Sequence, residues 1–323
     1  SQPVVFITKD INVRLKADAL GIQVEDFECE QVDYDELYSG VQELTVDAAW
    51  MNDFFRAKSA PLPESPFLYP NGFVQLIDRD DPKHVAYGWC RHDRIEPFPE
   101  GGGERVGGIA PRNIEQRMAL LLLTNPDIPV VTLIGQAGSG KTLLALAAAL
   151  QSVVHEPTYD KILVTRPIIP FGKDIGYLPG DKDEKLNVWM QPIYDNLEFL
   201  LQSGKKELQT VRRRMEEMKR AHQIELEALT YIRGRSIPRQ FIIVDEAQNL
   251  TPHEVKTIVS RSGEGTKMIL TGDPAQIDNP YLDASSNGLS FLVERFKTIN
   301  LHGHITLRKS ERSPLAAAAA EML

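Results

Sequence analysis

Cysteine is scarce in this chain. Cys29 and Cys90 are the only cysteines among 323 residues, and they lie far apart in the sequence. Two such residues provide neither a disulfide framework nor the paired spacing of a zinc site. We therefore expect a protein of a reducing compartment, the cytoplasm.

Long hydrophobic runs and an excess of basic residues are also lacking. No apolar run reaches the roughly 18 residues that a membrane-spanning helix needs, and the amino terminus has no basic-then-apolar leader. The formal net charge of −9 argues against coating nucleic acid by bulk charge, but it does not exclude a local basic groove. These absences predict a soluble protein that is not exported and contacts no membrane.

The composition is that of an ordinary globular protein, with 42% hydrophobic and 25% charged residues. The length suits two or three domains of roughly 150 residues each. We expect three segments, with boundaries at residues 1–60, 61–110 and 111–323. Because the chain begins at Ser1 and enters the apolar "VVFIT" at once, it is interpreted as a fragment of a longer chain.

The first third of the chain predicts two small units. Residues 4–8 read as a strand, and "KDINVRLKADALG" reads as a helix that stops at Gly21. Weak periodicity over residues 28–60 and the proline-rich "APLPESPFLYPNG" indicate a linker. Alternating segments between residues 72 and 100 predict a small antiparallel module of three strands, which "EGGGERVGG" detaches from the remainder of the chain.

From residue 111 on, strands alternate with helices. Continuous apolar runs at residues 130–134, 161–165, 241–245 and 267–272 are typical of strands buried on both faces, so we predict an α/β fold with a parallel sheet. Residues 204–239 form a basic, helical region in an acidic chain. A solvated helix with its own salt bridges explains that region as well as a functional surface does.

The clearest motif is "GQAGSGKT", which lies between an apolar strand and a helical segment. It fits the phosphate-binding loop, in which glycines let backbone N–H groups and a helix N-terminus face phosphate oxygens. Lys141 would reach the β- and γ-phosphates of a nucleotide, and the Thr142 hydroxyl would bind Mg²⁺. The candidate nucleotide-binding residues are Gly135, Gln136, Ala137, Gly138, Ser139, Gly140, Lys141, Thr142 and Leu143.

A pair of acids follows the apolar run of "FIIVDEAQN". Asp245 would lie at the carboxyl end of a buried strand, where it can hold the magnesium ion. Glu246 would orient and deprotonate the attacking water, which favours hydrolysis over phosphate transfer to a substrate. Upstream, Gln116 has the amide chemistry to pair with an adenine edge, although by itself a plain helix glutamine is the favoured interpretation.

These motifs in their order resemble the core of superfamily 1 helicases: Gln116, the glycine loop, "TRP", "DEAQN" and "GDPAQ". The segments "TRPIIPFGKDIGYLPGDKDEKLNVWMQPIYDNL", "YIRGRSIPRQFIIVDEAQN" and "GDPAQIDNP" resemble more specifically the PhoH family of ATPases, over residues 111–323. The resemblance implies a RecA-like P-loop NTPase core that uses ATP and Mg²⁺ and acts on single-stranded or structured RNA.

The beginning of the chain resembles the final strand and helix of the PIN ribonuclease domain found in PIN-PhoH proteins, with Asp10 at the position of the last metal-site acid. A nuclease of this kind collects several carboxylates around its metal, so Asp10 alone cannot cleave RNA. We expect no nuclease activity from this fragment, and we expect it from the intact protein.

The same resemblance supplies arginine candidates. Arg166, Arg233 and Arg235 would lie near the nucleic-acid path, although packing and subunit contacts explain them equally well. Arg312 maps to the arginine that approaches the γ-phosphate and neutralises charge in the transition state, with Arg308 as its rival. Because helicases complete this site with a second domain and this chain has one, we expect a homo-oligomer, a hexameric ring.

Gln276, in the "LTGDPAQIDNP" stretch, completes the predicted site. Its amide would contact the γ-phosphate and the attacking water, and its loop would pass the change to the nucleic-acid groove. The alternative is a plain turn stabilised by Asp273 and Pro274. The preferred function is an RNA-acting ATPase motor that feeds a nuclease; the alternatives are a P-loop kinase and a slow, nucleotide-gated assembly module.

Overall fold

The computed structural model describes residues 5–8, 11–25, 32–34, 36–167, 189–202, 208–229 and 236–311. Four of the residues singled out from the sequence lie outside this part of the chain: Asp10, Arg233, Arg235 and Arg312. At the amino end, a short parallel pair of β1 (Phe6–Ile7) and β2 (Val24–Glu25) flanks helix α1 (Ile11–Ala19). Gly21 follows the helix with φ +70°, so glycine ends it as the sequence predicts.

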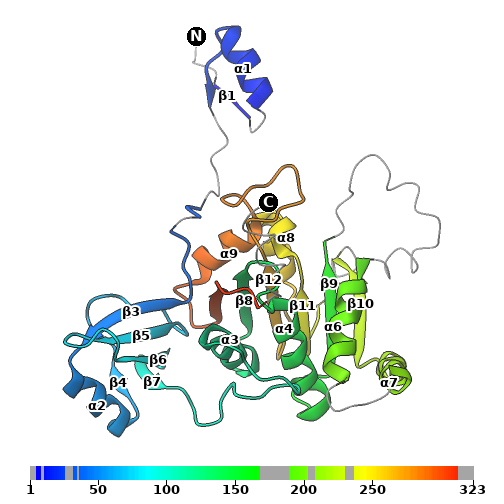
Figure 1. The fold of residues 1–323 in the computed structure, drawn as a ribbon. Coiled ribbons are helices and arrows are strands. Elements are labelled where there is room, and N and C mark those ends of the chain that lie inside the picture. The colour runs from blue at the N-terminus through cyan, green and yellow to red at the C-terminus, as the bar shows by residue number, and fades with distance from the viewer. Residues whose placement is uncertain are drawn as a thin grey trace.

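A six-stranded parallel sheet forms the centre of the molecule (Figure 1), as the apolar runs predict. Its order is β10-β9-β11-β12-β8-β13. The strands are β8 (Val130–Gly135), β9 (Lys161–Arg166), β10 (Ile224–Ala228), β11 (Gln240–Val244), β12 (Lys267–Gly272) and β13 (His302–Leu307). The sequence predicts the four inner strands but not the two edges, because "IELEA" and "HGHITL" are too polar to read as buried runs.

Helices cover both faces of this sheet (Figure 1). They are α3 (Ile114–Thr124), α4 (Lys141–Leu150), α6 (Gln191–Leu201), α7 (Leu208–Arg220), α8 (Pro252–Val259) and α9 (Gly288–Phe296), with a π-helical turn at Gln151–His155 and a 3-10 turn at Ala247–Asn249. One core joins α3, α4 and α6 to alternate strand residues, and the other joins α8 and α9 to the remaining ones. Successive strand residues point to opposite faces, which explains why whole strands are apolar.

In its described part, residues 208–229 and 236–239, the basic region contains a helix and a strand. Two of the arginines of helix α7 form ion pairs with their side chains exposed, Arg212 with Glu198 at 3.2 Å and Arg213 with Glu217 at 3.0 Å. Strand β10 then pairs with β9 at the edge of the sheet. For these residues of α7, the interpretation as a solvated, salt-bridged helix fits the structure.

The β-rich module begins earlier than residue 61. Its sheet has the order β3-β5-β6-β7-β4, from β3 (Val41–Val46), β4 (Ala60–Pro61), β5 (Phe73–Asp78), β6 (Val85–Arg91) and β7 (Arg94–Pro97), with helix α2 (Ala48–Ala57) packed on it. Met51 and Phe54 of α2 lie in its core together with Leu68. The residues assigned to a linker therefore belong to the module, whose first strand escapes detection because "VQELTV" carries little apolar signal.

The module docks on the central sheet and is not detached by its glycines. Asn71 Nδ2 donates to the carbonyls of Asn300 at 2.8 Å and His302 at 2.9 Å. In the glycine run, Gly107 has φ +55°, and a Cβ at this position would meet the Ala147 carbonyl oxygen at 2.2 Å. The glycines therefore let this segment pack tightly against helix α4.

A buried lysine fixes the end of helix α3. Lys267 is 1% exposed, and its ammonium donates to the carbonyls of Leu122 at 3.0 Å, Asn125 at 2.7 Å and Ile128 at 2.7 Å. Three carbonyls at a helix C-terminus match the three donors of an ammonium group. Burial lowers the pKa of Lys267 to about 7, although the negative charge of Asp127 acts to raise it. None of the helices in the described ranges is long and apolar enough to cross a membrane.

Candidate nucleotide site

The phosphate-binding loop joins β8 to α4 with left-handed glycines. Gly138 has φ +82° and Gly140 has φ +95°, a region that side chains with a Cβ rarely adopt. Gly135 is also constrained, because a Cβ there would meet the Leu307 carbonyl oxygen at 2.4 Å. This backbone places the N-terminus of α4 beside the loop, as an anion-binding site requires.

Lys141, the first residue of α4, folds back onto the loop. Its Nζ donates to the carbonyl oxygen of Gln136 at 3.0 Å and also to that of Gly135. These carbonyls hold the ammonium at the mouth of the loop. Phosphate oxygens are stronger acceptors for a charged donor, so a bound nucleotide would draw Lys141 away from them.

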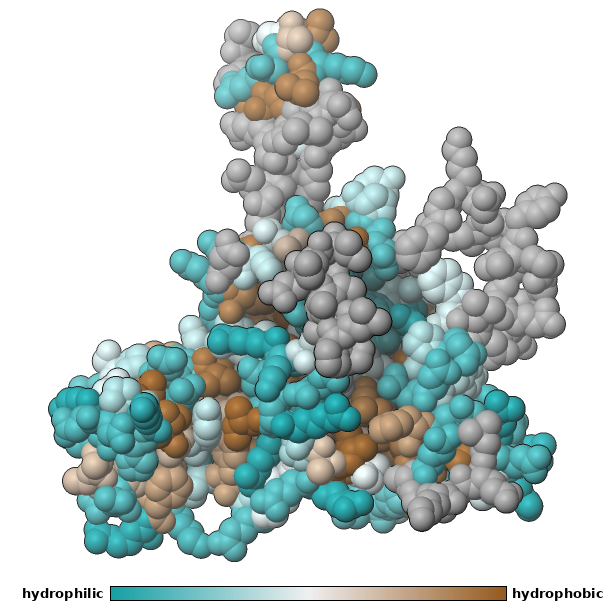
Figure 2. Space-filling model, in the orientation of Figure 1, coloured by the Kyte–Doolittle hydropathy of each residue, from teal (hydrophilic) through white to brown (hydrophobic). Residues whose placement is uncertain are grey.

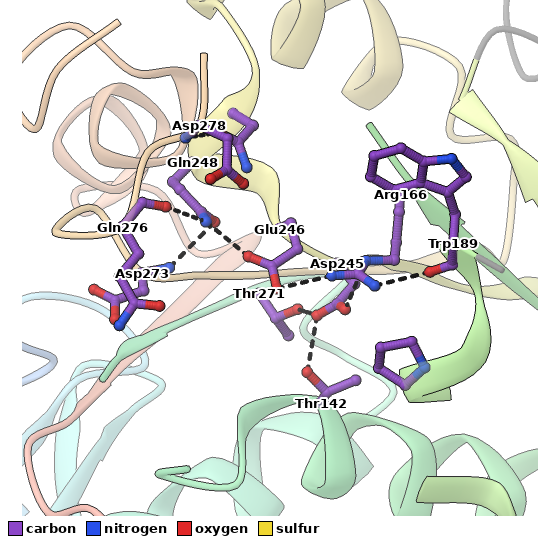
Figure 3. A network of polar contacts seen from close by, with 12 residues as sticks. Thr142, Arg166, Trp189, Asp245, Glu246, Gln248, Thr271, Asp273, Gln276 and Asp278 are labelled. Atoms are coloured by element: carbon purple, nitrogen blue, oxygen red, sulfur yellow. Dashed lines mark hydrogen bonds and ion pairs between the residues drawn. The ribbon is translucent and has the colours of Figure 1, made fainter. Parts of the chain in front are cut away.

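Asp245 follows β11 and lies against Thr142, as the sequence predicts for a shared magnesium site. Its Oδ1 accepts from the Thr142 hydroxyl at 2.8 Å and from the Thr271 hydroxyl at 2.7 Å (Figure 3). Burial raises the pKa of Asp245, and so does the neighbouring Glu246, while Arg166 opposes both. A carboxylate and a hydroxyl are the oxygen donors that Mg²⁺ takes beside phosphate oxygens and water, so these residues fit the ion. No cluster of three or more His, Cys, Asp or Glu side chains suited to a metal occurs in the described ranges.

Glu246 lies beside Asp245 with a left-handed backbone, φ +57°. Its Oε1 accepts from Arg166 Nη2 at 2.9 Å, and its Oε2 accepts from Gln248 Nε2 at 2.7 Å. The side chain is 39% exposed, so water reaches it. The turn thus directs Glu246 toward the same site as Asp245, where a general base for hydrolysis would act.

Gln248 is the residue that sequence reasoning missed. It is 1% exposed, and its Nε2 donates both to Glu246 and to the Gln276 carbonyl oxygen at 2.8 Å, while its Oε1 accepts from Asp273 N at 3.2 Å (Figure 3). It therefore joins Glu246 to the loop after β12. The available signal was its place in "DEAQN", two residues after the acid.

Gln276 contributes its backbone to this network. Its carbonyl oxygen accepts from Gln248, its N–H closes a turn on Asp273 at 2.9 Å, and its side chain is exposed. Because β12 lies between β8 and β11, this loop starts between the phosphate-binding loop and the two acids. The turn stabilised by Asp273 is present, and the contact of the Gln276 amide with a nucleotide stays a prediction.

We expect Gln248→Ala to lower ATP turnover by about tenfold or more with little change in nucleotide affinity, because Glu246 and the loop lose their shared buried donor. Gln276→Ala keeps the backbone carbonyl that accepts from Gln248 and removes the side chain, so it separates the predicted γ-phosphate contact from the Gln248 bridge. Steady-state phosphate release and nucleotide titration, each with and without RNA, measure the effects. If Gln276→Ala alone loses RNA-stimulated turnover, its side chain and not the Gln248 bridge carries the coupling.

Gln116 lies at a cavity next to the loop but uses its amide on the protein. Its Nε2 donates to the Ser139 carbonyl at 3.0 Å, and its Oε1 accepts from Arg112 N at 2.8 Å. The cavity, about 330 Å³, is lined by Gln116, Gly138, Gly140, Leu143, Leu144 and Phe199, among others. Its size and apolar walls suit a nucleotide base. An adenine edge would have to share the Gln116 amide with these two contacts or displace them.

The chain just before Arg312 runs along the phosphate-binding loop. Ser310 Oγ donates to the Ala137 carbonyl at 3.3 Å, and Glu311 N donates to the Gly138 carbonyl at 3.1 Å. Arg308, the rival arginine, has an exposed side chain, and its backbone N–H donates to Glu115 Oε2 at 2.8 Å. Arg166, expected near nucleic acid, instead directs its guanidinium at Asp245 and Glu246.

The parallel sheet, the loop between β8 and α4 and the acids after β11 define a P-loop NTPase with a RecA-like core. The family described as PhoH-like protein matches residues 108–323, and a PIN domain matches residues 1–28. The chain belongs to the PhoH family and carries a small PIN remnant ahead of it.

The curated relatives agree with this assignment. Protein PhoH2 of Bacillus subtilis (strain 168) is 49% identical over 327 residues, which cover 100% of this chain and 73% of that protein. Protein PhoH2 of Mycolicibacterium smegmatis is 35% identical over 322 residues, which cover 99% of this chain and 70% of that protein. Among solved structures, the Pif1 helicase of Candida albicans matches with a TM-score of 0.31 and 16% identity, over 62% of this chain and 40% of that one.

Proposed function

We propose that this chain is the ATP- and Mg²⁺-dependent motor part of a protein that acts on RNA and couples the motor to a PIN ribonuclease. The observation that carries the proposal is the bridge from Glu246 through Gln248 to the loop at Gln276. It joins the residue suited to activate water to a surface loop. A motor needs such a link, because hydrolysis must change the shape of a second site.

The roles of the site residues follow from their chemistry. Lys141 and the backbone of Gly135–Thr142 bind the triphosphate, and Thr142 and Asp245 hold the magnesium ion, which supplies charge neutralisation at the phosphates. Glu246 takes the proton of the attacking water. Gln276 senses the γ-phosphate, and Arg312 neutralises the transition state from its own or a neighbouring subunit.

Assembly and RNA contacts complete the proposal. The described residues contain one RecA-like core, and we place the second side of the site on a neighbouring subunit of a homo-oligomer, a hexameric ring. Arg233 and Arg235 are the candidates for the RNA path, and RNA in single-stranded or structured form is the proposed partner. The match of residues 1–28 to a PIN domain supports the coupling to a nuclease.

The test is ATP turnover with and without single-stranded RNA, followed by an unwinding assay. We expect RNA to stimulate the wild type, and Lys141→Ala to lose nucleotide affinity and turnover because the phosphates lose their ammonium donor. Lys58→Ala, at an exposed lysine of the β-rich module, is the matched control. Figure 2 shows this module at the lower left, with hydrophilic residues over much of the face in view. Normal turnover by a protein that neither binds RNA nor responds to it would contradict the motor.

A further inference from the structure

Arg166 binds the two catalytic acids with its whole guanidinium. Nε lies 3.4 Å from Asp245 Oδ2, and Nη2 donates to Glu246 Oε1 at 2.9 Å. Nη1 donates to the Trp189 carbonyl oxygen at 2.9 Å, and the arginine side chain is only 16% exposed (Figure 3). We call these three contacts the Arg166 clamp. Within the described ranges, no other basic side chain contacts either carboxylate.

The clamp covers carboxylate oxygens that a loaded site needs. The other oxygens are already held, Asp245 Oδ1 by two threonine hydroxyls and Glu246 Oε2 by Gln248. Mg²⁺ binds its oxygens at about 2.1 Å in strict octahedral geometry, and it would face a guanidinium of the same charge sign a few ångströms away. Glu246 Oε1 is a weaker proton acceptor while it accepts a charge-assisted hydrogen bond from Arg166. Magnesium therefore competes with the Arg166 clamp for Asp245, and the attacking water competes with it for Glu246.

The third contact extends this competition to helix α6. Trp189 lies just ahead of α6, whose Phe199 lines the cavity beside the phosphate-binding loop. The side of α6 that faces inward packs against α4 in the main core, through Ile193, Leu197 and Leu200. Arg166 thus ties the two acids to the helix that borders the expected base pocket. Displacement of the guanidinium would release the two acids and the Trp189 carbonyl together.

We propose that Arg166 is a positioning residue that holds Asp245, Glu246 and the start of α6 together until a magnesium-bound nucleotide displaces its guanidinium from the acids. The inference rests on the proposed function, since it takes this site to bind Mg²⁺ with a nucleotide. By thermodynamic linkage, the clamp weakens magnesium binding by the same factor by which magnesium weakens the clamp. The release of the clamp therefore depends on magnesium binding and not on nucleotide binding alone.

The test measures this coupling without turnover. A fluorescent ADP analogue is titrated into the full chain in the presence of Mg²⁺ and, separately, of EDTA. The dissociation constant in EDTA divided by that in Mg²⁺ reports how strongly the metal favours binding. We expect this ratio to rise by about tenfold in Arg166→Gln, because loading no longer breaks a charge-assisted contact with the acids. Arg166→Lys keeps the charge but loses the fork, and its ratio should fall between the two.

Arg213→Gln makes the same charge change on an exposed arginine of α7 and should leave the ratio unchanged. A merely structural role for Arg166 would weaken ADP binding equally with Mg²⁺ and with EDTA, so an unchanged ratio in Arg166→Gln and Arg166→Lys overturns the clamp while the nucleotide site stands. If the wild type binds no nucleotide under either condition, the proposed function fails and the clamp fails with it.

Discussion

Glu246→Gln should reduce ATP turnover by about a hundredfold to a thousandfold while the protein still binds magnesium nucleotide, because the amide cannot take a proton from the attacking water. The change keeps the shape of the side chain. The phosphate-binding loop, Lys141 and Asp245 remain intact, so nucleotide affinity should change by no more than about threefold. Phosphate release at saturating ATP and titration with a fluorescent nucleotide measure the two effects.

Glu246→Gln also has a second effect, on the hydrogen bond to Gln248, which a loss of turnover would include. Glu246 Oε2 accepts from Gln248 Nε2, so the new amide would set one NH₂ group against another and disturb the bridge to the loop. Glu246→Asp keeps the charge and both acceptors but shortens the reach, and it should lose turnover as well. Glu264→Gln repeats the charge change at an exposed glutamate. Turnover of Glu246→Gln within about twofold of the wild type would remove Glu246 as the base.

The strongest sequence predictions are those that physical constraints on a short segment can fix. Glycines at 138 and 140, a lysine at the start of a helix and an acid after an apolar strand each require only local geometry, and the structure brings them to one edge of the sheet. Gln248 differs, because its importance comes from the partners that β11 and β12 place around it. In sequence it looks like any polar residue after an acid, whereas the exposed Gln276 stands out in its loop.

The missed strands show the same limit. β13 carries His302 and His304 where an inner strand would carry valine or isoleucine, and both rings contact Thr132, which is distant in the sequence. β3 has no apolar run of its own. It pairs with β5, from which α2 and β4 separate it in the chain. Hydrophobic periodicity indicates which residues within one segment are buried. It cannot report that a histidine is paired with a threonine 170 residues away.

That histidine pair joins β13 to the strand that leads into the phosphate-binding loop. Thr132 Oγ1 lies 2.9 Å from His302 Nε2 and 2.7 Å from His304 Nδ1, and His304 Nε2 lies 3.0 Å from Thr306 Oγ1. Burial lowers the pKa of His302 to about 4 and that of His304 to about 3. Each ring is therefore neutral in the fold, with one nitrogen accepting a hydrogen bond that protonation would break.

Mild acid should therefore destabilise the folded chain by about 4 kcal/mol between pH 7.5 and pH 5. The sign follows from the pKa values: in the unfolded chain both histidines take up protons below about 6.5, while in the fold they do not until about 4 and about 3. Stability is thus greatest above a pH of about 6.5 and falls as the pH falls toward the folded-state values. Urea unfolding at pH 7.5, 6.0 and 5.0 measures the loss.

His304→Gln should remove about half of this pH dependence, since glutamine does not titrate, although it also lowers stability at pH 7.5 by disturbing the bond to Thr132. His253→Gln, an exposed histidine of α8, should keep the full slope and is the control for the loss of one imidazole. Carboxylates contribute little in this range because most of them titrate below about pH 5. A wild type whose stability is flat from pH 7.5 to pH 5 would mean that the pair is protonated within the fold.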